Sequence, residues 1–71
     1  MKKTTLLKKL DEKVQKIYDS LYSLKELLDS VEDGELEAMA DEFVELMEST
    51  ISEGDINIES IKDYIYEYYE N

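Results

Sequence analysis

The chain of 71 residues contains no cysteine, histidine, tryptophan, proline or arginine, and it has only two glycines. Without cysteine it can form no disulfide, no thiolate nucleophile and no thiolate metal site. Without histidine it lacks both the usual general base near neutral pH and the commonest metal ligand. Two isolated glycines cannot build a glycine-rich phosphate loop. We therefore expect a protein that is not an enzyme and that holds no cofactor and no metal.

Long apolar runs are also missing. No stretch approaches the ~20 apolar residues of a membrane span, so we expect no membrane association and a cytoplasmic location. A chain this short forms one domain at most, which we place at residues 1–71. Because such a small domain buries only about 60% of its unfolded surface, a partner or a second copy would add stability.

Apolar residues in the first segment follow a heptad pattern. Their spacing alternates between three and four residues without an error, which predicts one long helix over residues 5–32. We expect Gly34 to end this helix in a left-handed conformation. The pattern consists of Leu7, Leu10, Val14, Ile17, Leu21, Leu24, Leu28 and Val31.

Two further amphipathic segments follow, and they predict helices over residues 35–52 and 58–70. Gly54 is the expected stop of the second helix, and Asn57 is a good N-cap for the third. In the third helix, Tyr64 and Tyr68 fall on the apolar stripe and are expected in the core, whereas Tyr66 falls off it.

Short connections favour antiparallel neighbours, so the predicted fold is an all-α, three-helix up-down-up bundle with one long first helix. Folded back from Gly34, the second helix is too short to cover the start of the first. The leucines at that start would overhang, and exposed apolar patches of this kind mark interfaces. We therefore expect an antiparallel homodimer through the first helix. The expected self-association residues are Leu6, Leu7, Leu10 and Val14.

Charge is sorted along the sequence. Six lysines face two carboxylates in residues 1–16, whereas seventeen carboxylates face only Lys25 and Lys62 in residues 17–71. The formal net charge is −11. A field this one-sided repels nucleic acid and attracts basic protein surfaces, so we expect a basic protein partner and no direct nucleic-acid binding.

Carboxylates on the second helix form a ridge, because separations of four, four and three residues place them on one face. With an exposed tyrosine as a possible anchor, this ridge is the expected contact with the basic partner. The expected partner-binding residues are Glu37, Asp41, Glu42, Glu45, Glu48 and Tyr66.

In size, acidity and tyrosine content the chain resembles bacteriocin-nuclease immunity proteins and phage-encoded DNA-mimic or anti-CRISPR inhibitors. The resemblance is one of composition, and it implies an inhibitor that blocks the nucleic-acid-binding site of a nuclease, toxin or defence enzyme. The alternative is a coiled-coil-like homodimeric scaffold module with no inhibitory role, which the heptad pattern favours. Salt separates the two, because only the inhibitor would lose its partner as ionic strength rises.

Overall fold

The structure is a computed structural model, and it describes residues 1–70. These residues form three α-helices and no strand, which confirms the all-α prediction. The helices are α1 (Lys3–Asp29), α2 (Gly34–Glu53) and α3 (Ile58–Tyr68). Within the described residues, no helix combines the length and the apolar character that crossing a bilayer requires.

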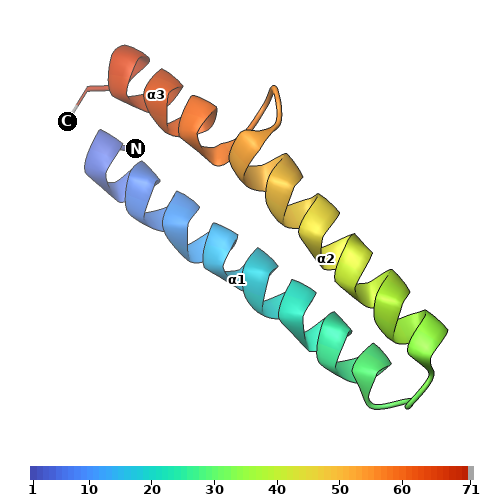
Figure 1. The fold of residues 1–71 in the computed structure, drawn as a ribbon. Coiled ribbons are helices and arrows are strands. Elements are labelled where there is room, and N and C mark those ends of the chain that lie inside the picture. The colour runs from blue at the N-terminus through green and yellow to red at the C-terminus, as the bar shows by residue number, and fades with distance from the viewer. Residues whose placement is uncertain (71) are drawn as a thin grey trace.

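Helix α2 folds back along α1, and α3 continues in the direction of α2 (Figure 1). The residues that follow α3 therefore lie beside the start of α1, where the Lys3 amide donates to the Glu70 carbonyl oxygen at 3.2 Å. The up-down-up order is not confirmed, because α3 runs antiparallel to α1. The connection explains this: Gly54 and Asn57 both have extended backbone, with ψ angles of 170° and 176°, so the chain runs on without reversing.

The predicted overhang at the start of α1 is wrong. Helix α3 occupies the space beside that start, as the ion pair between Lys62 and Asp11 at 3.1 Å shows. Leu6, Leu7 and Leu10 are accordingly half-buried rather than free. The sequence prediction failed here because it gave α3 the opposite direction.

The molecule is a single layer of helices. Its Cα atoms extend 50 × 21 × 8 Å. The Cα atoms of one helix span about 4.6 Å, and a second layer would add about 8–10 Å between helix axes, so the thin dimension holds one layer. In a layer of this kind, side chains are buried only along the line where α1 contacts α2 and α3, which we call the seam. The buried apolar residues in the described part of the chain are Leu21, Ala40, Val44 and Ile65, and each keeps a small part of its surface exposed.

Side chains at the helix ends define the two connections. Asp33 caps α2 by accepting from the amides of Glu35 and Leu36, at 3.0 and 3.3 Å. The left-handed residue between α1 and α2 is Glu32, with φ at 58°, and Gly34 is the first residue of α2. The left-handed conformation predicted for Gly34 is therefore wrong.

The α2–α3 connection agrees with the sequence. Gly54 ends α2, and Asn57 caps α3 by accepting from the Ser60 amide at 2.8 Å. The Asn57 side-chain amide also donates to the Gly54 carbonyl oxygen at 2.7 Å, which ties the cap to the end of α2. A Cβ at Gly54 would lie 2.8 Å from the Thr50 carbonyl oxygen, so the last turn of α2 leaves no room for a side chain there.

Candidate interaction surfaces

One face of the helical layer is closed by polar contacts, and we call it the polar face. The Lys25 ammonium lies 2.8 Å from Asp29 and 2.9 Å from Asp41, which joins α1 to α2. Nearby, the Tyr22 hydroxyl donates to the Glu48 carboxylate. Residues 22, 25 and 29 follow each other at helical spacing, so these contacts form one line along the seam.

The same line continues onto α3. Lys62 pairs with Asp11, and the Lys3 ammonium donates to the Tyr66 carbonyl oxygen at 2.9 Å. That ammonium also lies 5.7 Å from the centre of the Tyr66 ring, within the range of a cation–π contact. The polar face therefore carries cross-helix contacts along most of the molecule.

These contacts change how three groups titrate. Hydrogen bonds to Asp29 and Asp41 raise the pKa of Lys25 above its usual range. The hydrogen bond to Asp11 likewise raises the pKa of Lys62. The pKa of Tyr22 is raised first by its hydrogen bond to Glu48, because ionising the phenol removes the donated proton. All three groups thus favour the protonated form that the polar face uses.

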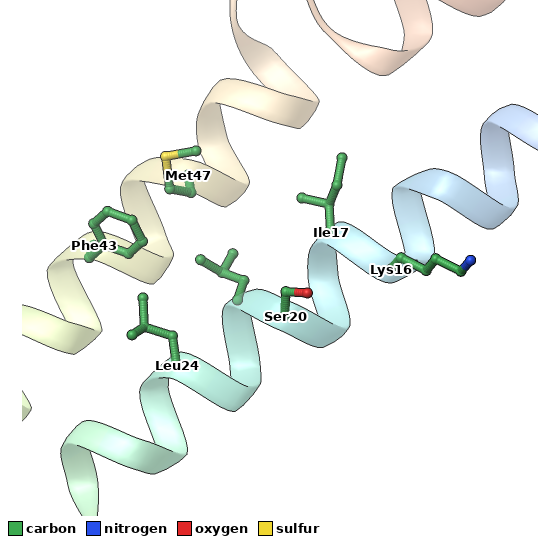
Figure 2. Close-up of a pocket in the computed structure, with 7 residues that line it drawn as sticks. Lys16, Ile17, Ser20, Leu24, Phe43 and Met47 are labelled. Atoms are coloured by element: carbon green, nitrogen blue, oxygen red, sulfur yellow. The ribbon is translucent and has the colours of Figure 1, made fainter.

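The opposite face is apolar and open, and we call it the apolar face. Its larger groove has a volume of about 410 Å³ and runs between α1 and α2. Figure 2 shows Ile17 and Leu24 on the α1 side and Phe43 and Met47 on the α2 side, with Lys16 extending away. Ile17 and Phe43 remain 49% and 46% exposed. No side chain spans this groove with an ion pair among residues 1–70.

A second groove of about 260 Å³ continues the apolar face toward α3. It shares Ile17 with the first groove, so the two form one surface along α1. Its apolar lining comes from all three helices and from the connection before α3. These residues are Leu10, Val14, Ile17, Ile51, Ile56, Ile58 and Ile61.

The carboxylates of the predicted ridge do not form one surface. Asp41 and Glu48 are turned toward α1, where they contact Lys25 and Tyr22 on the polar face. Glu42 and Glu45 instead lie together beside a shallow hollow on the far side of α2. Glu37 is exposed and lies in neither group.

The hollow on α2 contains a residue that the sequence analysis missed. Leu46 lies with Glu42, Glu45 and Ser49, and we call these four residues the outer edge. Leu46 is 66% exposed. The available signal was its spacing, three residues after Phe43 and seven after Met39, which widens the apolar stripe of α2 toward Glu42 and Glu45.

The tyrosines of α3 lie apart from the α2 carboxylates. Tyr66 is exposed, as predicted, but it lies at the end of the molecule where α3 meets the start of α1. Tyr64 and Tyr68 are also exposed, so their predicted place in the core is wrong. Their rings contact each other in a tilted arrangement, with centres 4.7 Å apart and planes at 39°.

The four predicted self-association residues lie together near α3. Leu6, Leu7, Leu10 and Val14 are half-buried, because α3 and the end of α2 pack beside them. Leu10 and Val14 also line the second groove, so they form part of the apolar face. The exposed apolar surface is thus shifted from the start of α1 toward its middle.

Comparisons with protein-family models, with curated proteins and with solved structures found no match to this chain. Within residues 1–70, no three acidic side chains converge in a way that could hold a metal ion. Three surfaces remain for functional interpretation: the polar face, the apolar face and the outer edge of α2.

Proposed function

We propose that this chain binds a basic surface on another protein and blocks it. The target class we favour is the nucleic-acid-binding site of a nuclease, toxin or defence enzyme. The single observation that carries the proposal is the charge of α2, which holds seven carboxylates and no lysine. A surface of this sign attracts the patches that bind phosphate groups.

We take the outer edge, rather than the predicted ridge, as the contact region. Asp41 and Glu48 already have partners within the chain, whereas Glu42 and Glu45 lie outside the ion pairs of residues 1–70. Beside them Leu46 offers an exposed apolar side chain. Charge at such a surface raises the rate of association, and a buried apolar anchor slows dissociation.

A charge reversal tests this proposal directly. The chain is immobilised and exposed to a cell lysate at low salt, and bound proteins are identified by mass spectrometry. We expect a basic nucleic-acid-binding protein, and we expect Glu42→Lys with Glu45→Lys to reduce its association rate by about tenfold or more. The matched control reverses two exposed carboxylates of α1, Glu12→Lys with Glu26→Lys, and should bind almost as the wild type does.

The captured protein then decides whether binding is inhibition. Added wild-type chain should release nucleic acid from it in a gel-shift assay, and raised salt should abolish the effect. The proposal fails if the captured protein keeps its nucleic acid, or if both double variants bind equally well. The rival scaffold interpretation predicts self-association without any salt-sensitive partner.

A further inference from the structure

The isolated chain has more surface than a compact protein of its mass. Its accessible area is 5658 Å², whereas a compact monomer of 8.4 kDa exposes only about 4,600 Å². Its radius of gyration is 15.7 Å, compared with about 11 Å for a compact domain of this length. The excess area follows from the single layer, which leaves both faces of the helices accessible.

The excess matches what an interface needs. About 1,000 Å² of extra surface on each of two chains gives roughly 2,000 Å² in total, and stable interfaces bury about 1,200–2,000 Å². The apolar face is the part of the molecule suited to this burial. Its two grooves meet at Ile17, and Leu24 and Phe43 remain accessible at 37% and 46%.

We propose that a second copy of this chain covers the apolar face about a two-fold axis parallel to the helices, forming a bundle of four helical rods, in which each copy supplies α1 as one rod and α2 continued by α3 as the other (Figure 1). Two helical layers packed face to face enclose one core, which is the usual way for helices to bury an apolar stripe. The interface is isologous, since the same face is used by both copies.

Charge selects which helices meet. Lys13 and Lys16 border the grooves on α1, whereas α2 carries carboxylates and no lysine. An axis parallel to the helices places α1 of one copy over α2 of the other, so the groove lysines of α1 lie over a helix that carries no positive charge. An axis across the helices would place α2 over α2 and Lys16 near its own copy, which is repulsive.

This arrangement replaces the pairing expected from the sequence, in which α1 packs on α1. It is also independent of the proposed function. No residue of the outer edge lines either groove, so a chain that binds no basic partner can still form the dimer.

Mass in solution tests the dimer. Light scattering coupled to size exclusion, at tens of micromolar, should give twice the 8.4 kDa mass of the chain. Phe43→Glu places a charge in the groove and should raise the dimer dissociation constant at least about tenfold. Tyr66→Glu makes the same change at an aromatic residue on the polar face, 59% exposed, and should leave the constant unchanged.

Circular dichroism of each variant at the same concentration shows whether helicity survives. If Phe43→Glu unfolds, the mass of the wild-type protein in solution still tests the proposal. A wild-type mass equal to that of one chain overturns it, whatever the variant does. Monomeric wild type that binds an unrelated helix would overturn it equally, since the occupant would not be a second copy.

Cross-linking tests the arrangement, and the absence of native cysteine makes introduced thiols unique. Lys25 pairs with Asp41 across the two antiparallel helices. Ser20 lies five residues before Lys25 and Met47 lies six residues after Asp41, so Ser20 and Met47 stand at nearly the same height along the helices. The proposed axis keeps that height from one copy to the other. Chains with Ser20→Cys mixed with chains carrying Met47→Cys should form a mixed disulfide on mild oxidation. The control, Ser20→Cys mixed with Ser52→Cys, should not. Cross-links formed only between two Ser20→Cys chains would place α1 on α1 and overturn the arrangement.

Discussion

The two faces of the helical layer differ in how the side chains meet along the line between the helices. On the polar face, cross-helix contacts from Lys25, Tyr22 and Lys62 close the seam, and each joins groups that are exposed or only half-buried. On the apolar face, Ile17, Leu24 and Phe43 approach each other without filling the groove between them. Exposed ion pairs add little stability, whereas apolar burial adds much. The polar face therefore fixes how the helices align, and the apolar face holds most of the stability that a partner could add.

The largest expected effect on stability comes from truncating a leucine in the buried seam, compared with truncating a leucine on the apolar face. Leu21→Ala removes a side chain that is 7% exposed, and we expect a loss of about 2–5 kcal/mol in the free energy of unfolding. Leu24→Ala removes the same atoms from the open groove, so its cost in the monomer should be well below that of Leu21→Ala. Urea unfolding of both variants measures the difference.

The Leu24→Ala result also depends on the second copy. If the apolar face is covered in the dimer, the destabilisation by Leu24→Ala should grow as protein concentration rises. A cost equal to that of Leu21→Ala at every concentration would mean that the two positions are buried alike, which contradicts the open face.

The joint between α2 and α3 gives the next effect. Gly54→Ala forces a Cβ to within 2.8 Å of the Thr50 carbonyl oxygen, so we expect a loss of about 1–3 kcal/mol. Gly34→Ala is the matched control, because no atom lies within 4 Å of its Cβ position. Alanine there should stabilise by about 0.4–1 kcal/mol through the unfolded chain. Thermal melts would contradict the close contact if both substitutions had the same sign.

Salt tests the balance of charge across the whole surface. With a net charge of −11 and few carboxylates in ion pairs, the folded chain repels itself, and screening should raise the melting temperature. Calorimetry at low and moderate sodium chloride measures the shift. A melting temperature that falls with salt would mean that the pairs of the polar face outweigh the repulsion.

The smallest effect concerns alkaline pH and the polar face alone. Hydrogen bonds raise the pKa values of Tyr22 and Lys25, so their contribution is complete below the ordinary values, near pH 10, and is lost as pH rises through the folded values. Tyr22→Phe should therefore flatten the decline in stability above pH 10. Thermal melts of the wild type and the variant from neutral to alkaline pH measure how steeply stability falls with pH. Identical slopes would mean that the Tyr22–Glu48 contact does not contribute to stability.

Periodicity carried most of the correct predictions. The unbroken heptad spacing of α1 and the stripe of α2 predicted helices that the structure contains, because an apolar face repeats with the helical turn whatever it packs on. The Asn57 cap and the Gly54 stop were also predicted, since both depend on local hydrogen bonds. The interaction surfaces were harder to predict. Helical spacing places Asp41 and Glu45 on one side of α2, but it cannot show that Asp41 forms an ion pair with Lys25 of α1.

The sequence by itself determined the helices, their ends at Gly54 and Asn57, and the separation of charge, because each depends on neighbours along the chain. The tertiary structure alone decided the direction of α3, which follows from extended backbone at 54 and 57 rather than from any apolar pattern. That direction covers Leu6 and Leu7 and leaves a layer one helix thick. It thereby moves the open apolar surface to Ile17, Leu24 and Phe43, since a stripe buries only the side that a neighbouring helix happens to reach.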